Sequence, residues 1–424
     1  MLISCKDKTI NLELEAPPSK SVWHRELIVG FLSGTLFEKD LDPEEGDSVD
    51  IRATKACLKA LYTSKEDTIV LPCAESGSTL RFMIPVALVY LGLADKSNTK
   101  KLEFTTAGRL IERPLDDLEK CLEPFGVKFT KITDENRIIV EGRLTAGDYV
   151  IDGSVSSQYI SGLLMALSAI PDEVSTVLVT GNIASVHYIN LTVAVLSKYG
   201  CYVERKDNVF IIPEERDNEE LSGFVSKVEG DWSNGAFLLA LGALLSDGSV
   251  KVKGLNPISV QGDRDIIEHL ETLGIEYTRE LSGDITVKGQ VGKQKIETAV
   301  FDMTHTPDIA PYVSVLGMFF AKKTTLNGIS RLRIKESDRA QAIKDDLEKA
   351  GAKVTAEEDK MVIESPDGNF PQEIKLSSYN DHRMAMTAIL IAAGTGAVVD
   401  VDDIECLSKS YPAFIDVVKK EFAV

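Results

Sequence analysis

Basic residues, serines and a few carboxylates gather in six short polar clusters, and each cluster runs directly into an apolar stretch of helical length. Such residues at a helix start can bind anions, because a helix N-terminus presents unpaired backbone N–H groups and a partial positive charge. Arginine suits bidentate binding of a carboxylate, and lysine acts as a point charge. A site for multiply charged anions is therefore predicted from SKSVWHR (19–25), ESGSTLR (75–81), GSVSSQY (153–159), GDWSNGA (230–236), HTPDIAP (305–311) and NDHRMAM (380–386).

The clusters also recur at a regular interval. After the first, they follow one another about 75 residues apart, which is typical of internal repeats. Four glycines that end amphipathic stretches keep the same period, and a glycine just past a helix is its usual left-handed cap; they are Gly126, Gly200, Gly274 and Gly351. The two markers together predict between five and six repeats of helix and strand, of which the first is short.

The overall composition limits the possible functions. A chain of 424 residues predicts two domains. The net charge of −19 disfavours non-specific binding to nucleic acid or to an anionic membrane. The apolar stretches are too short to span a bilayer, and no secretory signal is visible. Six cysteines without metal-ligand or disulfide spacing predict reduced thiols in a cytoplasmic protein, with no metal and no cofactor.

Each cluster taken alone also has a plain structural explanation. Ser19 fits an N-cap, and Arg81 and Arg113 fit an ion-pair partner and a surface arginine. Lys335 and Arg339 stand at i and i+4, the spacing of ion pairs on a helix surface. The ordered combination of clusters, rather than any one of them, favours the anion site.

In this order the motifs resemble those of the EPSP synthase (3-phosphoshikimate 1-carboxyvinyltransferase) family, nearly from end to end. The resemblance rests on SKS…R (19–25), SGST.R (76–81), ERP (112–114), DGSVSSQY (152–159), EGD (229–231), H.PD (305–308), R.KESDR (333–339), NDHRMAM (380–386) and KSYP (409–412). It implies an α/β fold of α+β repeats with two similar domains, each of three βαβαββ units, arranged as an inside-out α/β barrel. Helix N-termini would face an interdomain cleft. The first domain would span 18–229, and the second 1–17 with 230–424, including both termini.

The same resemblance implies an activity. The family transfers the enolpyruvyl group of phosphoenolpyruvate to the 5-hydroxyl of shikimate 3-phosphate, giving 5-enolpyruvylshikimate 3-phosphate and phosphate. This reaction belongs to the shikimate pathway to chorismate and the aromatic amino acids. The expected partners are these two small anionic substrates, with no nucleic acid and no membrane. The protein is expected to act as a monomer whose two domains close around the substrates.

The resemblance also implies roles for residues of the matching motifs. Those expected to bind shikimate 3-phosphate are Lys20, Ser21, Arg25, Ser156, Ser157, Gln158, Ser185, Tyr188, Asp308 and Lys335. Those expected to bind phosphoenolpyruvate are Lys20, Gly77, Arg113, Gln158, Arg339, Arg383 and Lys409.

The chemistry itself requires proton transfer. The attacking hydroxyl must lose a proton while the carbon next to the attacked one gains a proton, and the flow then reverses as phosphate leaves. Asp308 is expected to act as the base and Glu336 as the acid, with Lys20 as a further proton carrier. Because neighbouring cations favour ionised carboxylates, Glu336 needs a bound anion to act as an acid.

Several alternatives and departures accompany this interpretation. The UDP-N-acetylglucosamine enolpyruvyl transferases share the chemistry, but Lys20 is followed by Ser21 instead of the asparagine usual there. An RNA 3′-phosphate cyclase is disfavoured by the acidic charge, and a non-catalytic repeat scaffold would not require this ordered set of ionisable residues. The chain departs from the family pattern at Trp23, His24, Glu75, His187 and Arg331.

Overall fold

The computed structural model describes residues 1–94, 100–170, 172–183, 185–214 and 228–424. The chain divides into two compact units: unit 1 contains Met1–Ser19 and Glu229–Val424, and unit 2 contains Lys20–Val228. Both chain ends belong to unit 1. The boundaries expected from the sequence, 18–229 for one domain and 1–17 with 230–424 for the other, lie within two residues of this division.

One βαβαββ arrangement recurs in the described residues. Its first two strands are parallel and joined by a helix, and a second helix leads to a hairpin that pairs antiparallel with the second strand. In unit 2 the first copy forms a sheet in the order β3-β4-β6-β5. It consists of β3 (Thr68–Ala74), α3 (Gly77–Ala94), β4 (Lys101–Thr106), α4 (Asp116–Leu122), β5 (Lys128–Ile132) and β6 (Arg137–Glu141).

The second copy in unit 2 follows directly and has the equivalent order, β7-β8-β10-β9. It consists of β7 (Asp148–Asp152), α5 (Ser157–Leu167), β8 (Ser175–Thr180), α6 (Val186–Lys198), β9 (Glu204–Lys206) and β10 (Val209–Ile212).

In unit 1 one copy is interrupted by the whole of unit 2. Its first strand, β2 (Ile10–Glu15), pairs parallel with β11 from Ile10↔Gly248 to Glu15↔Lys253, although unit 2 lies between β2 and the helix that should follow it. The remaining elements are α7 (Trp232–Leu244), β11 (Gly248–Lys253), α8 (Ile266–Thr272), β12 (Tyr277–Arg279) and β13 (Ile285–Lys288).

Two further copies complete unit 1. The first consists of β14 (Ile296–Asp302), α9 (Ala310–Phe320), β15 (Ala321–Asn327), α10 (Arg339–Lys349), β16 (Lys353–Ala356) and β17 (Lys360–Glu364). The last is shortened, and its sheet is completed by the N-terminal strand β1, which pairs antiparallel with β19. Its elements are β18 (Glu373–Leu376), α11 (His382–Thr395), β19 (Val398–Val401), α12 (Phe414–Val417) and β1 (Leu2–Ile3).

Unit 2 departs from the expected third repeat. Its first two helices, α1 (Lys20–Leu32) and α2 (Val49–Thr63), have no strand between them. The connecting residues 33–48 are rich in charge and turn formers, with Gly34 and Gly46 at positive φ, and they lack the alternation of apolar residues that a strand needs. Within the described ranges, unit 2 thus holds two complete βαβαββ copies and a helical remnant of a third.

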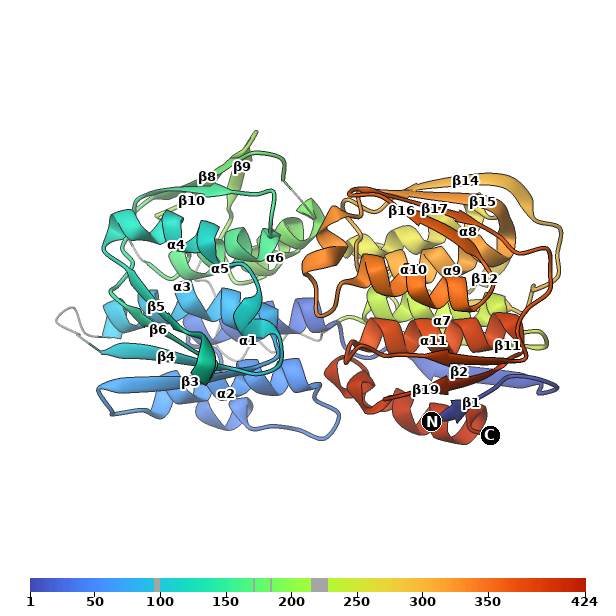
Figure 1. Cartoon of the computed structure of the whole chain (residues 1–424). Helices are drawn as coiled ribbons and strands as arrows, with labels where there is room; N and C mark the ends of the chain where they lie inside the picture. The colour runs from blue at the N-terminus through green and yellow to red at the C-terminus, as the bar shows by residue number, and fades with distance from the viewer. Residues whose placement is uncertain (95–99, 171, 184, 215–227) are drawn as a thin grey trace. The chain divides into compact units, whose positions relative to one another are not determined.

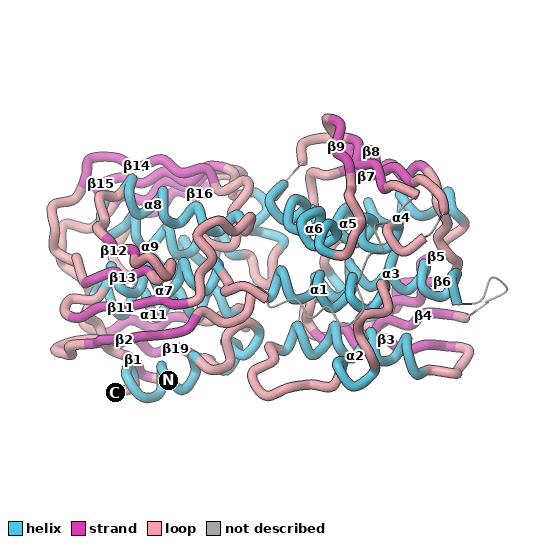
Figure 2. The backbone as a smooth tube through the Cα atoms, turned by 180° about the vertical axis from the view of Figure 1, so that it is seen from behind, coloured by secondary structure: helices cyan, strands magenta, loops and turns pink. Residues whose placement is uncertain are grey.

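The helices that connect parallel strands form the centre of each unit. In unit 1, α7 and α9 are buried along their whole length and α11 along nearly all of it, and these helices pack against one another. A helix that is apolar all round must be buried on all sides. The strands alternate buried and exposed residues, so the open sheets cover the helices and turn one face outward (Figures 1 and 2). This is the inside-out arrangement, without a closed barrel in the described residues.

The repeat markers found in the sequence have the expected conformation. Gly126, Gly200, Gly274 and Gly351 all have positive φ, at 79°, 76°, 68° and 100°. A residue with a Cβ would be strained there, which explains why each repeat places glycine at this helix end.

The two segments that connect the units lie side by side within unit 1. Ser19 N donates to Glu229 O and Asp231 N donates to Pro17 O, both at 2.8 Å. The Gln261 side chain ties both segments, because it accepts from Ser19 Oγ at 2.8 Å and donates to Gly230 O at 2.9 Å. The point at which the chain leaves and re-enters unit 1 is thereby fixed.

The described residues include no helix that is both long and apolar enough to cross a membrane. No group of three or more His, Cys, Asp or Glu side chains among them is arranged to hold a metal ion. All six cysteines are buried thiols.

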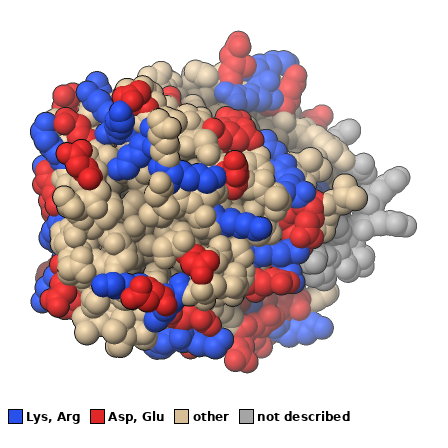
Figure 3. Space-filling view, turned by 90° about the vertical axis from the view of Figure 1, so that its right-hand side faces the viewer, with Lys and Arg blue, Asp and Glu red and all other residues tan. Residues whose placement is uncertain are grey.

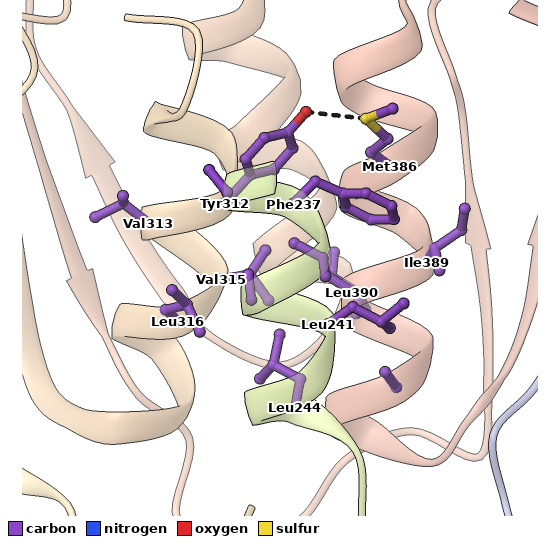
Figure 4. Close-up of a cluster of buried hydrophobic side chains, with 14 of the residues drawn as sticks. Phe237, Leu241, Leu244, Tyr312, Val313, Val315, Leu316, Met386, Ile389 and Leu390 are labelled. Carbon is purple, nitrogen blue, oxygen red and sulfur yellow. Dashed lines mark hydrogen bonds between the residues drawn. The ribbon is translucent and has the colours of Figure 1, made fainter. Parts of the chain in front are cut away.

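The central helices make a direct prediction about stability. Leu241 lies in the buried middle of α7 (Figure 4). We expect Leu241→Ala to lower the free energy of unfolding by about 2–5 kcal/mol, because it removes packing and leaves a cavity. Leu281, fully exposed between β12 and β13, provides the control, with an expected change below about 0.5 kcal/mol for Leu281→Ala. Urea unfolding followed by circular dichroism measures both, and equal losses would contradict the assigned core.

Candidate active site

Three helix starts in unit 2 lie close together. α1, α3 and α5 pack against one another and begin at Lys20, Gly77 and Ser157. Ser156 caps α5, its Oγ accepting from Gln158 N at 3.3 Å, and both Ser156 and Ser157 are buried. α3 and α5 each follow the first strand of a repeat, and α1 begins where the chain enters unit 2. Their polar first turns therefore gather at one end of the unit.

A chain of side-chain hydrogen bonds connects α3 to α5. Arg81 Nη1 donates to Gln158 Oε1 at 2.8 Å, and Gln158 Nε2 donates to Ser78 Oγ at 2.9 Å. Arg81 Nη2 also donates to Pro114 O at 3.2 Å, which fixes the segment after Arg113. Gln158 is therefore held in one orientation by Arg81.

Arg113 lies directly over the start of α3. A Cβ placed on Gly77 would come within 2.5 Å of Arg113 Nη1. Gly77 thus leaves room for the guanidinium of Arg113 at the helix start, and any larger residue would displace it. The structure brings together Gly77, Arg113 and Gln158, three of the residues expected to bind phosphoenolpyruvate.

Lys20 is paired with a carboxylate that sequence reasoning missed. Its Nζ lies 2.8 Å from Asp50 Oδ2 on α2, and both side chains are largely buried. The sequence showed Asp50 only as the last of several acids in the stretch 38–50. Its position on the α2 face toward α1 could be recognised only once the two helices were packed.

Most of the guanidinium donors of Arg25 bind protein groups. Its Nε donates to Thr192 Oγ1 at 2.7 Å, Nη1 to Ser21 O at 2.6 Å, and Nη2 to Ser161 Oγ at 3.2 Å and Tyr188 O at 3.0 Å. These bonds use four of the five N–H groups of a guanidinium. Burial lowers the pKa of Arg25 to about 9. Arg25 thus holds α1 to α6 and brings the expected ligands Ser21 and Tyr188 together.

Ser185, another expected phosphate ligand, stands directly before α6. It is buried and adopts a positive φ of 52°. A non-glycine residue in this region is uncommon and is often found at functional sites.

In unit 1 the starts of α7, α9 and α11 are also packed together. The Phe237 and Tyr312 ring centres are 5.8 Å apart, and Tyr312 OH lies 3.0 Å from Met386 Sδ (Figure 4). Asp231 caps α7 by accepting from Asn234 N at 2.7 Å, and Asp381 caps α11 by accepting from Arg383 N at 2.9 Å. Polar residues therefore occupy the same end of this three-helix core.

Arg339 organises the carboxylates of this half-site. The first residue of α10, it is 1% exposed and binds Asp381 through Nε–Oδ2 at 2.8 Å, Asp308 through Nη1 at 2.8 Å and Glu336 through Nη2 at 2.8 Å. Burial alone would lower the pKa of Arg339, but the three carboxylates outweigh it and hold the pKa well above the usual range. The expected base and acid, Asp308 and Glu336, therefore share one guanidinium.

Lys335 provides a second cation beside Asp308. Its Nζ lies 3.3 Å from Asp308 Oδ1. Burial lowers the pKa of Lys335 to about 8, against the attraction of Asp308. The carboxylate of Asp308 thus lies between a lysine and an arginine, which favours its ionised, base form.

Arg383 differs from Arg339 in having few protein partners. It is the second residue of α11 and 4% exposed, and its Nη1 donates to Tyr312 OH at 2.9 Å. Within the described part of the chain, its Nε is buried without a hydrogen-bond partner. A buried guanidinium with unsatisfied donors is suited to binding an external carboxylate.

Lys409 lies close to the start of α11. Its Nζ donates to Asn380 O at 2.6 Å. Tyr379 and Asn380 both have positive φ, at 53° and 52°, so the turn that delivers Asp381 to Arg339 is conformationally unusual.

Some departures from the family pattern have structural roles. His24 Nδ1 lies 2.7 Å from Thr54 Oγ1, and burial holds its pKa well below the usual range, so the ring is neutral. Lys55 Nζ lies 5.4 Å from the centre of the Trp23 ring. Glu75 fills the space beside Gly108, where an added Cβ would lie 2.7 Å from Glu75 Oε2.

The positive charge of the site is local. On the face shown in Figure 3, Lys and Arg side chains are interspersed with Asp and Glu. Anion affinity in a chain of net charge −19 therefore has to come from the local groups at the helix starts.

Comparisons with known proteins agree with this arrangement. A profile of the family described as EPSP synthase (3-phosphoshikimate 1-carboxyvinyltransferase) matches residues 5–418. The 3-phosphoshikimate 1-carboxyvinyltransferase of Clostridium acetobutylicum is 33% identical over 428 residues, covering 95% of this chain and 93% of the relative. That of Clostridioides difficile is 31% identical over 427 residues, with the same coverage.

Solved structures support the fold. The EPSP synthase of Acinetobacter baumannii has a TM-score of 0.70 at 20% identity, covering 100% of this chain and 98% of that one. The enolpyruvyl transferase NikO from Streptomyces tendae has a TM-score of 0.67 at 15% identity, covering 99% and 97%. The α/β fold expected from the sequence is confirmed.

The Arg339 cluster leads to a second stability prediction. Asp381→Ala removes a fully buried partner of Arg339, so we expect the free energy of unfolding to fall by about 3–5 kcal/mol. The control is Glu348→Ala, which removes an exposed partner of Lys344 and should cost less than about 0.5 kcal/mol. Denaturant unfolding distinguishes the two, and a small loss for Asp381→Ala would mean that Arg339 does not depend on this carboxylate.

Proposed function

Because this chain belongs to the EPSP synthase family, we propose that it transfers the enolpyruvyl group of phosphoenolpyruvate to the 5-hydroxyl of shikimate 3-phosphate. The products are 5-enolpyruvylshikimate 3-phosphate and phosphate, in the shikimate pathway to chorismate and the aromatic amino acids. The family match over residues 5–418 supports the reaction class. The observation that carries the chemistry is that Asp308 and Glu336 are both bound by Arg339.

The proton transfers follow from this cluster. Asp308, ionised beside Lys335 and Arg339, accepts the proton of the 5-hydroxyl as its oxygen forms a bond to C2 of phosphoenolpyruvate. Glu336 supplies a proton to C3, giving a tetrahedral intermediate. The proton flow then reverses: Glu336 takes a proton back from C3, and the proton held by Asp308 passes to the departing phosphate as the bond between C2 and the phosphate oxygen breaks, which restores the double bond. Lys20 is a further proton carrier.

The cations divide between the substrates. Arg383, with donors not used by the protein, binds the carboxylate of phosphoenolpyruvate together with Arg339. The phosphate of phosphoenolpyruvate is bound by Lys20, Gly77, Arg113 and Lys409, and Gln158 also contacts this substrate.

Shikimate 3-phosphate is bound by hydroxyls and amides more than by free cations. Its phosphate is bound by Ser156, Ser157 and Ser185, its ring lies against Gln158 and Tyr188, and its hydroxyls contact Asp308 and Lys335. Its carboxylate is bound by Ser21 and by the one N–H of Arg25 that the four intramolecular bonds leave over. Arg25 thereby acts mainly by positioning Ser21 and Tyr188.

Two small anions are the partners, and the protein acts as a cytoplasmic monomer. The six buried cysteines, which form no disulfide in the described structure, support a reducing compartment.

The reaction is tested by phosphate release from phosphoenolpyruvate. We expect release that depends on shikimate 3-phosphate and none with UDP-N-acetylglucosamine as the acceptor. Release only with the nucleotide sugar would assign the other enolpyruvyl transferase activity, and silence with both would indicate a non-catalytic scaffold.

The role of Asp308 is tested by Asp308→Asn. This change keeps the shape of the side chain but removes the base, so we expect kcat to fall by about 10²–10⁴-fold. The affinity for both substrates, measured by calorimetry, should change much less. Glu348→Gln, on the exposed face of α10, is the matched control and should leave kcat unchanged. A kcat of Asp308→Asn near that of the control would exclude Asp308 as the base.

A further inference from the structure

One buried carboxyl group next to the unit 1 half-site has no part in the reaction described above. Asp263 lies in the 3-10 turn η5 (Gly262–Asp265), which packs against α7, and its residue exposure is 4%. Its Oδ2 accepts a hydrogen bond from Ser233 Oγ in the first turn of α7. Asp263 is thus attached to the same helix end that carries the polar residues of unit 1.

The second oxygen of this carboxyl group lacks a partner. Within the described residues, Oδ1 of Asp263 is buried and forms no hydrogen bond. An ionised carboxylate has room for several donors and is costly to bury without them, whereas a neutral carboxyl group is less costly. The burial of Asp263 and the missing hydrogen bond at Oδ1 therefore favour the protonated form of its carboxyl group.

The charges that face Asp263 come from the elements packed at this end of the core. They are Asp308 before α9, Arg383 on α11 and Asp231 before α7, together with the Ser233 hydroxyl. Burial and the charge of Asp308 raise the pKa of Asp263 to about 7, Arg383 and Ser233 oppose this shift, and Asp231 adds to it. Asp263 therefore changes charge near neutrality.

We propose that Asp263 is a proton-accepting positioning residue that takes up one proton from solvent when the carboxylate of phosphoenolpyruvate binds at Arg383. The inference rests on the proposed function for the identity of the anion. The charge of Arg383 favours the ionised form of Asp263 and also attracts the incoming carboxylate, so an ionised Asp263 would offset the cation that the ligand needs. Protonation removes this competing charge without any movement of the backbone.

The proposal has a defined pH dependence. Below the pKa of about 7, Asp263 is already neutral and binding needs no proton. Above it, each bound phosphoenolpyruvate must bring a proton, so the dissociation constant and KM for phosphoenolpyruvate should rise by up to about tenfold per pH unit. The effect should appear in KM more than in kcat, because Asp263 acts on binding and not on the reacting atoms.

The test is isothermal titration calorimetry of phosphoenolpyruvate, with shikimate 3-phosphate present, in two buffers that differ in ionisation enthalpy. One pH unit above the pKa of Asp263, we expect wild-type protein to take up nearly one proton more than Asp263→Asn. Lys335, whose pKa burial lowers to about 8, can also gain a proton, but it is present in both proteins and cancels in the difference.

Asp346→Asn is the matched control. Asp346 is also buried, burial likewise raises its pKa to about 7, and it faces Lys349, Asp345 and Asp402 instead of the site. This variant should retain the wild-type proton uptake. Ser233→Ala removes a hydrogen bond that favours the ionised form of Asp263, so the uptake should shift to higher pH.

Infrared difference spectroscopy provides a readout without turnover. Ligand addition above the pKa should produce a protonated-carboxyl band in the wild type and in Asp346→Asn, and this band should be absent in Asp263→Asn. Equal proton uptake in Asp263→Asn and the wild type would overturn the proposal, as would a failure of phosphoenolpyruvate to bind at all. Normal binding and uptake without phosphate release would instead count against the proposed function alone.

Discussion

The parallel strand–helix–strand connection is the constraint on which the rest of the structure depends. A helix that joins two parallel strands must run back against them, so it starts at the end where the first strand finishes. The joining helices α3, α5, α9 and α11 begin directly after such a strand, and α7 begins where the chain returns from unit 2 to the end of β2. These five are the helices buried inside the units. Their packing gathers their polar N-terminal turns at one end of each unit.

Gathering polar groups at buried helix ends creates an electrostatic cost that the protein offsets locally. Arg339 is balanced by Asp381, Asp308 and Glu336, Lys20 by Asp50, and Lys335 by Asp308. Buried charges without partners are expensive, so these pairs are needed for folding as well as for chemistry. Arg383 stands apart, since its guanidinium is buried with an unpaired Nε in the described structure. Arg339, Lys20 and Lys335 thus form ion pairs within the protein, whereas Arg383 keeps a buried donor that can bind a ligand.

The repeats were predictable because they depend on local rules. The clusters at helix starts and the four helix-ending glycines recur with one period, and the left-handed conformation of Gly126 or Gly351 follows from the residue type alone. The third repeat of unit 2 was expected but is reduced to α1 and α2 in the described residues, because residues 33–48 lack a strand pattern. The resemblance assigned Arg25 and Arg339 to the substrates, and the spacing of Arg339 also allowed an ion pair. In the structure most donors of both guanidinium groups bind protein groups.

The sequence by itself determined the family, the α/β repeats and the residue types at the helix starts, because helix caps, periodic apolar residues and ordered motifs are properties of neighbouring positions. Only the tertiary structure decided which charges are paired. Asp50 and Lys20 are 30 residues apart, Asp381 and Arg339 are 42 apart, and Asp263 and Ser233 are 30 apart. Such pairs form when separate helices pack, and the energy of a charge depends on its burial and its neighbours in space, which no local pattern specifies.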